Sequence, residues 1–226
     1  MNDQLEGLVT VVNMDFKPSK KAVENFIKRW RLADFYWDPY SEIQEQGFLN
    51  FYMNHWFRNE RNRFGISCFS TRSLNSLMWA HYGNKHSGVC LIYSKQILLE
   101  SLLIKGSNCK CLTVDYDKRP AITLVEKNSE IEYFSDIPIV ATKDANWRYE
   151  KEVRFVLEEM NEEPFHGRPV EVSHSALKGV IYGYQTSEEE KDAISLLIRN
   201  DPHYNQILEL NVEIDYGTGK MYLIKD

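Results

Sequence analysis

Apolar residues recur at helical spacing in some stretches of the chain and alternate with polar residues in others. After Pro18, five apolar residues follow with the three-to-four-residue spacing of an amphipathic helix: Ala22, Val23, Phe26, Ile27 and Trp30. The same criteria predict helices over 41–63, 74–82, 98–103 and 187–199, and strands over 7–14, 66–70, 88–93, 111–116, 178–184, 207–216 and 220–224. Residues 117–137 are weakly patterned, and we expect a helix near 122–132 or a mobile connection.

This mixture of helices and short strands predicts the α+β class, with a mixed or antiparallel central sheet flanked by helices. We expect one domain over residues 1–226, because a chain of this length can bury a single core. A polar loop is expected over 158–169, and an aromatic segment over 32–40 ends at Asp38-Pro39.

The stretch 146–157 alternates polar and apolar residues and is predicted to be a strand. Side chains then sort by period two, with Val153 and Phe155 on one face and Glu150, Glu152 and Arg154 on the other. The two carboxylates would lie roughly 7 Å apart along the strand, close enough to reach one ligand. Two interpretations stay open: a ligand site, or an ordinary antiparallel strand with a solvated polar face.

The composition of the chain argues against some classes of function. The net charge of −6 argues against non-specific duplex binding, which needs a basic surface. No apolar run approaches the ~18 residues of a membrane span, and the first residues lack a signal-peptide pattern, so we expect a cytoplasmic protein without membrane contact. The four cysteines lack paired C-x-x-C spacing, and we expect them to be reduced and structural.

Polar and aromatic residues also gather before and within the predicted helix 74–82. Ser70, Thr71 and Ser73 stand where hydroxyls can cap that helix. Within the helix, His81 and Tyr82 precede Gly83, and a histidine at this place suits either a ligand or a structural role. The histidines show no spacing of metal ligands, so no metal site is expected among them.

Several motifs in a fixed order resemble a bacterial domain family of unknown function, the one numbered 2971. They are C-F-S-T at 68–71, M-W-A-H-Y at 78–82, H-S-G-V-C at 86–90, W-R-Y-E-K-E-V-R at 147–154 and an aromatic-D-P-Y-S-E element at 36–42. The resemblance covers roughly residues 35–200. Members usually open with a strand containing tyrosine and arginine, whereas residues 8–15 contain neither.

The order of elements is also similar to ADP-ribosyltransferases of the arginine, serine-threonine-serine and Glu-x-Glu type. This resemblance implies NAD as the substrate, with Glu152 as the catalytic carboxylate and Glu150 on the acceptor side. His81 and Tyr82 are the further catalytic candidates. The nucleotide-binding candidates are Ser70, Thr71, Trp79, Trp147 and Arg154. Since the first strand has no arginine, Arg31, Arg72 or Arg154 is expected to supply the positive charge.

Three functions follow as hypotheses. The first is an NAD-binding ADP-ribosyltransferase or NAD glycohydrolase of a bacterial phage-defence or toxin system, acting on a protein or nucleic-acid acceptor. The second is a metal-dependent nuclease that uses Asp115, Asp117, Glu150 and Glu152 as magnesium ligands. The third is a non-catalytic sensor or module that binds a protein partner in a defence locus.

Overall fold

Helices combine with mixed and antiparallel β-sheets in the computed structural model, which confirms the α+β class. The structure describes residues 11–13, 19–29, 64–104, 108–118, 121–135, 139–158 and 169–225. The predictions for 7–10, for the aromatic segment 32–40, for the helix 41–63 and for most of the loop 158–169 lie outside these residues. The chain groups into two compact units: one comprises 1–65, 113–147 and 159–166, and the other 66–112, 148–158 and 167–226. The expectation of a single domain over 1–226 stays a prediction.

The first unit holds a small mixed sheet in the order β1-β5-β6. Strand β1 (Val11–Asn13) runs parallel to β5 (Ala121–Lys127), which forms an antiparallel hairpin with β6 (Glu130–Ser135). Helix α1 (Lys20–Arg29) is joined to this hairpin, because the Ser19 amide and hydroxyl both donate to the Glu126 carboxylate, at 2.7 and 2.6 Å. These hydrogen bonds hold the pKa of Glu126 below its usual value.

The hairpin β5–β6 replaces the helix or mobile connection predicted near 122–132, and both forms of that prediction are wrong. Asn128 and Ser129 form the two-residue turn, with φ of 54° and 62°. Two successive left-handed residues are the requirement of a type I′ turn, whose twist matches that of paired strands. Asparagine tolerates this conformation, so Asn128 and Ser129 can form a tight turn between two strands.

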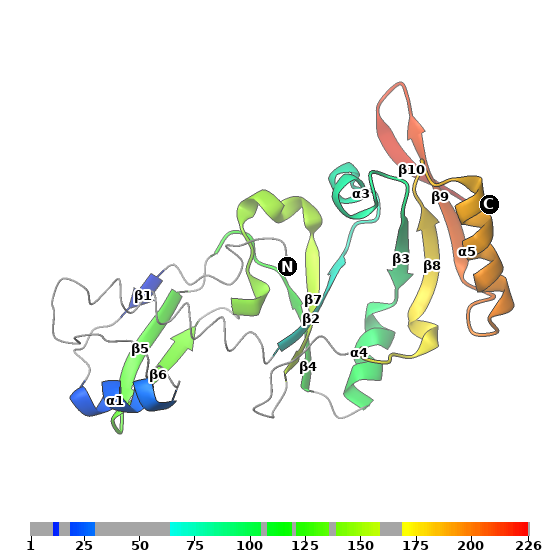
Figure 1. Cartoon of the computed structure of the whole chain (residues 1–226). Helices are drawn as coiled ribbons and strands as arrows, with labels where there is room; N and C mark the ends of the chain where they lie inside the picture. The colour runs from blue at the N-terminus through cyan, green and yellow to red at the C-terminus, as the bar shows by residue number, and fades with distance from the viewer. Residues whose placement is uncertain are drawn as a thin grey trace. The chain divides into compact units, whose positions relative to one another are not determined.

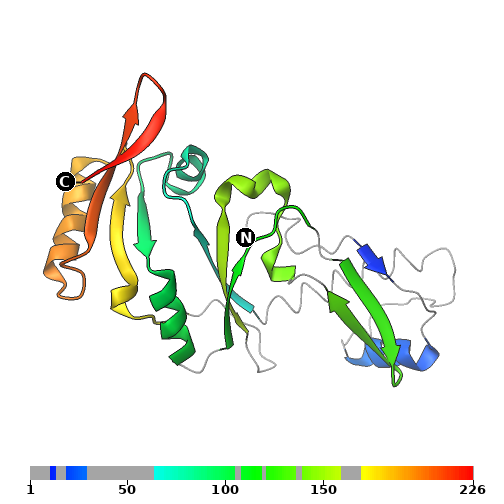
Figure 2. The same ribbon diagram turned by 180° about the vertical axis from the view of Figure 1, so that it is seen from behind.

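The second unit contains a four-stranded sheet in the order β10-β9-β8-β3. Its strands are β3 (Val89–Tyr93), β8 (Leu177–Tyr182), β9 (Leu208–Asp215) and β10 (Lys220–Lys225). Strand β8 is parallel to β9 and antiparallel to β3, and β9 and β10 form the predicted C-terminal hairpin. The hairpin extends beyond the other strands of this sheet (Figures 1 and 2).

Helix α5 (Glu188–Asn200) connects the parallel strands β8 and β9 and begins where the sequence predicted. Ser187 and Glu190 form a capping box, in which each side chain bonds to the backbone of the other residue. Three glutamates in the first turn complement the helix dipole. On one face of the sheet, Val180 and Tyr182 pack with Ile198 of α5.

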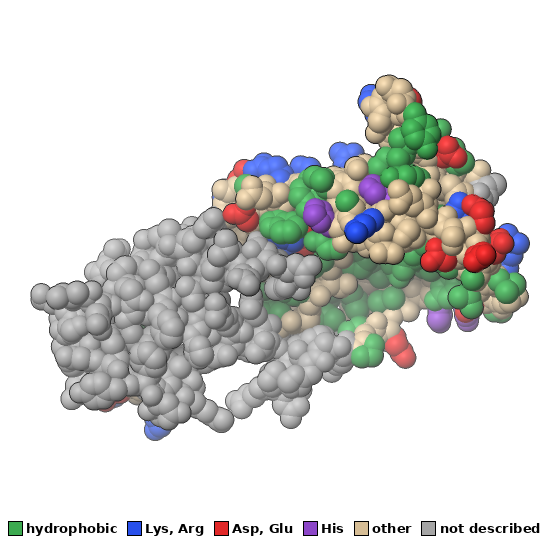
Figure 3. All heavy atoms as spheres, turned by 45° about the horizontal axis from the view of Figure 1, so that its top comes forward, with side chains coloured by type: hydrophobic (Ala, Val, Ile, Leu, Met, Phe, Trp, Pro, Cys, Tyr) green, Lys and Arg blue, Asp and Glu red, His purple; other side chains and the backbone are tan. Residues whose placement is uncertain are grey.

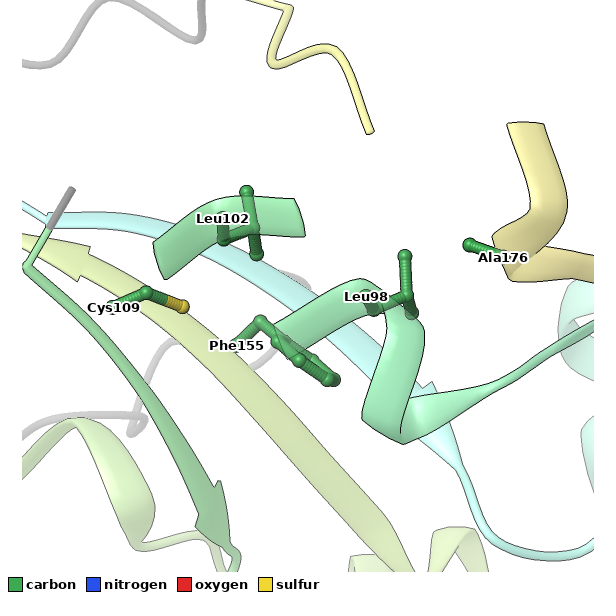
Figure 4. Packing of buried hydrophobic residues seen from close by; sticks show 5 residues of the cluster. All are labelled: Leu98, Leu102, Cys109, Phe155 and Ala176. Carbon is green, nitrogen blue, oxygen red and sulfur yellow. The ribbon is translucent and has the colours of Figure 1, made fainter. Parts of the chain in front are cut away.

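A three-stranded sheet of the second unit has the order β2-β7-β4. It is made of β2 (Phe64–Ser70), β7 (Glu152–Glu158) and β4 (Asn108–Thr113). Helix α4 (Lys95–Ile104) packs on it, with Leu98 and Leu102 against Phe155 and Cys109 (Figure 4). Phe69 of β2 and Tyr93 of β3 pack against the same cluster, so β2, β3, β4 and β7 contribute to one core. Strand β4, predicted over 111–116, begins at Asn108 and ends at Thr113.

The remaining elements are short. Helix α3 (Ser76–Tyr82) buries Trp79 against Ile181 and Val212. Three 3-10 helices complete the described elements: η1 (Ile139–Ala141), η2 (Ala145–Glu150) and η3 (His174–Ala176). No helix in the described ranges is long and apolar enough to cross a membrane. All four cysteines are free thiols.

Candidate functional site

The stretch predicted as one strand over 146–157 is divided at Lys151. Helix η2 ends at Glu150, Lys151 has a left-handed φ of 46°, and β7 begins at Glu152. The expectation that Glu150 and Glu152 lie on one face of one strand is therefore wrong. A lysine in the left-handed region is uncommon. Here it interrupts the period-two alternation of side chains on which the prediction of one strand was based.

Glu152 and Arg154 form an ion pair in the protein interior. Arg154 Nε donates to Glu152 Oε1 at 2.9 Å and Nη2 donates to Oε2 at 3.3 Å. The two residues share a face of β7, as the i, i+2 spacing predicted. Glu152 is only 4% exposed and Arg154 only 1%, so the predicted solvated face is wrong. The physical reason is that both faces of β7 are covered, because Val153 and Phe155 on the opposite face are buried as well.

Glu150 is buried behind a tyrosine that reaches the surface. Its carboxylate Oε1 accepts a hydrogen bond from the Tyr82 hydroxyl at 2.8 Å. Glu150 is 3% exposed, whereas Tyr82 is 51% exposed. The hydroxyl thus links the surface to a carboxylate that solvent reaches poorly, and that combination suits charge stabilisation or proton transfer.

The predicted hydroxyl motif holds the backbone beside Glu150. Ser70 Oγ donates to the Glu150 carbonyl at 2.7 Å, and the Thr71 amide and hydroxyl donate to the Lys151 carbonyl at 3.1 and 3.2 Å. Neither residue caps α3, contrary to the capping hypothesis. Asn75 is the cap, and its side chain accepts from the amides of Leu77 and Met78. Its Nδ2 also donates to the Tyr149 carbonyl at 2.9 Å, which joins α3 to η2.

The two aromatic candidates on α3 have different environments. Trp79 is 4% exposed and its Nε1 donates to the Ser73 carbonyl at 2.7 Å, so it packs in the core. His81 is exposed, and its ring lies over Tyr149 with centroids 6.3 Å apart and an interplanar angle of 30°. His81 and Tyr82 therefore contact consecutive residues of η2, Tyr149 and Glu150.

Trp147 and the aspartates of the nuclease hypothesis belong to the first unit. The Lys143 ammonium lies 5.1 Å from the centroid of the Trp147 ring, a cation–π contact. Asp115 Oδ1 accepts from the amides of Asp117 and Lys118, at 2.8 and 3.1 Å, and so forms a turn. Among the residues that the structure describes, no three His, Cys, Asp or Glu side chains are grouped as a metal site requires.

Two residues that contact the site, Asn75 and Tyr149, were not predicted from the sequence. Asn75 precedes the first residues of α3, and a polar residue directly before an apolar periodic run is a capping signal that could have been used. Tyr149 gives no such signal, because its contact with His81 joins segments 68 residues apart in the chain.

Comparison with known proteins agrees with the motifs. Residues 78–155 match a protein family described as a protein of unknown function, DUF2971, which confirms the resemblance over that range. The matched range contains α3 from Met78 onward, Tyr149, Glu150 and the first residues of β7. No curated protein and no solved structure matches the chain.

Proposed function

We propose that this chain, with its DUF2971 region, binds a nucleotide of the NAD type and cleaves or transfers it at the surface beside Tyr82 and Glu150. The observation that carries the proposal is the hydrogen bond from the hydroxyl of Tyr82, a half-exposed residue, to the carboxylate of the buried Glu150. A ligand on this surface meets the hydroxyl first and the carboxylate directly behind it. A carboxylate held in poorly hydrated surroundings stabilises nearby positive charge more strongly than one in water.

The chemistry requires such a charge. When NAD reacts, the bond between the ribose C1′ atom and the nicotinamide nitrogen breaks, and its electron pair goes to the nicotinamide ring. Positive charge then develops on the ribose. Glu150 would stabilise that charge and take the proton of the acceptor, either water or a protein group, as the acceptor bonds to C1′. His81 and Tyr149 supply an aromatic surface for a planar ring of the ligand.

The roles of the two carboxylates differ in this proposal from those expected from the sequence. Glu152 is occupied by Arg154 in the interior, so we assign it a positioning role at the start of β7. Glu150 takes the catalytic role instead, because the Tyr82 hydroxyl joins its carboxylate to a side chain that is half exposed. Ser70 and Thr71 fix the backbone of Glu150 and Lys151 rather than the ligand.

A second candidate is a non-catalytic binding module. The burial of both carboxylates favours it, since a buried and paired carboxylate is also what a purely structural network contains. Helix α5 further exposes Leu196 and Leu197, at 60% and 71%, and apolar side chains on one helix face can contact a partner.

Turnover of labelled NAD by the full-length protein tests the proposal. Glu150→Gln keeps the shape and removes the charge, so we expect turnover to fall about 100-fold or more. Tyr82→Phe removes one hydrogen bond to a carboxylate and should lower turnover about tenfold. A chelator should have no effect, whereas dependence on magnesium would favour the nuclease.

Tyr222→Phe is the matched control, because Tyr222 is 43% exposed and its hydroxyl donates to Glu213 at 3.4 Å on the β9–β10 hairpin. This variant should retain wild-type turnover. Absence of both NAD turnover and nucleotide binding in the wild-type protein would reject the proposal and leave the binding module.

A further inference from the structure

Two exposed cations, Arg72 and Lys151, are brought together beside the Tyr82–Glu150 pair. Thr71, which precedes Arg72, donates its amide and hydroxyl to the Lys151 carbonyl. Ser70 Oγ bonds to the backbone of both Arg72 and Glu150, at 3.1 and 2.7 Å. The backbone from Ser70 to Arg72 is thus fixed against that of Glu150 and Lys151 by hydrogen bonds between residues about 80 positions apart.

The charged side-chain groups of both residues stay available within the part of the chain that the structure describes. Both side chains are exposed, and among the described residues neither has an ion-pair or side-chain hydrogen-bond partner. The left-handed φ of Lys151 is a backbone conformation that a lysine adopts only when its surroundings impose it. Here the surroundings include the hydrogen bonds from Thr71 to the Lys151 carbonyl. The backbone of Lys151 is therefore held next to the residue that precedes Arg72.

The local charge contrasts with that of the whole chain. Residues 61–99 contain no Asp or Glu, although the chain has 33 acidic residues and a net charge of −6. On the face drawn in Figure 3, histidine and basic side chains lie in the middle of the coloured surface, and acidic side chains lie toward its two ends. An anion near Arg72 therefore meets no acidic side chain of the chain segment 61–99.

We infer that Arg72 and Lys151 form a binding site for the diphosphate group of a nucleotide. A diphosphate carries several negative oxygens, and two cations from neighbouring chain segments can each bond to one phosphate. Placing the phosphates there leaves the ribose near Tyr82 and Glu150, because Lys151 directly follows Glu150 in the chain. The inference rests on the proposed function for the identity of the nucleotide, but the anion site is testable without any turnover.

Calorimetric titration of the full-length protein with ADP-ribose and, separately, with inorganic pyrophosphate tests the site. Charge-assisted hydrogen bonds are the strong ones, so we expect Arg72→Gln and Lys151→Gln each to weaken binding of both probes about tenfold, and the double variant about 100-fold. Arg72→Lys keeps the charge and should recover part of the loss. Added salt should weaken wild-type binding more than binding by the double variant.

Lys178→Gln removes an equally exposed cation from β8 and should bind both probes as the wild type does. Wild-type affinity in the double variant, or no binding of either probe by the wild type, would overturn the inference. Tighter binding of a single-stranded oligonucleotide than of ADP-ribose would also overturn it, in favour of nucleic acid. Loss of NAD turnover in Glu150→Gln tests the proposed function separately, since that variant should still bind pyrophosphate.

Discussion

At the scale of single residues, the ion pair between Glu152 and Arg154 decides how substitutions in β7 should be interpreted. The alternating pattern places both side chains on a polar face, and replacing Glu152 by Gln would then cost little stability. Because both residues are buried, removal of either leaves an unpaired polar group or charge in the interior. Activity of a Glu152 variant therefore has to be measured together with its stability.

We expect Arg154→Met to lower the free energy of unfolding by about 3–5 kcal/mol, because it removes the Arg154 charge that pairs with the buried Glu152 carboxylate. The double variant Glu152→Gln/Arg154→Met should lose less than the sum of the two single variants. Urea denaturation followed by circular dichroism measures these changes. Lys191→Met, at the surface pair with the exposed Glu188, is the control and should change stability by less than about 1 kcal/mol. Equal effects of Arg154→Met and Lys191→Met would contradict the expectation.

At the scale of elements, the end of β8 packs closely against the turn that joins α3 to β3. Asn84, Lys85 and His86 all have positive φ, and the turn is held by hydrogen bonds from the Gly183 amide to the Gly88 carbonyl and from the Gln185 amide to the His86 carbonyl. A Cβ at position 183 would overlap the His86 carbonyl oxygen and come within 2.7 Å of its carbon. Glycine is required there by the close approach of two backbones.

Gly183→Ala should therefore destabilise the protein by about 3 kcal/mol, the upper end of typical overpacking costs. Thermal unfolding measures the loss. Gly217→Ala is the matched control in the β9–β10 turn, where the added Cβ meets only the Asp215 carboxylate oxygen, at 3.2 Å. A melting temperature of Gly183→Ala that equals that of Gly217→Ala would show that the turn 84–88 moves away at little cost.

At the scale of the whole molecule, burial is concentrated in the middle strands of the sheets in the second unit. Residues 153–156 of β7 and 180–182 of β8 are all buried, whereas β10 is an edge strand in which Tyr222 and Ile224 are 43% and 38% exposed. Hydrogen exchange measured by mass spectrometry should find the slowest amides in β7 and β8 and faster exchange in β10. Slower exchange in β10 than in β8 would contradict this distribution of stability.

The sequence by itself determined those elements whose signals are local. The capping residues of α5, the apolar positions of β8 and the turn glycines of the C-terminal hairpin are read from a few neighbouring residues, and the structure has these elements where they were predicted. The α+β class and the family resemblance follow from the order of such local signals. The pairing of Glu152 with Arg154 on one strand face was also predictable, because the period of a strand is fixed.

Only the tertiary structure decided which polar residues are buried and where the alternation breaks. A polar face next to an apolar one predicts solvent exposure only when one face of the sheet is open, and the burial of residues 152–156 shows that both faces of β7 are covered. The left-handed φ of Lys151 depends on hydrogen bonds from Thr71, which is 80 residues away in the sequence. Burial and such backbone turns are set by contacts between distant segments, and a pattern of neighbouring residues contains no information about them.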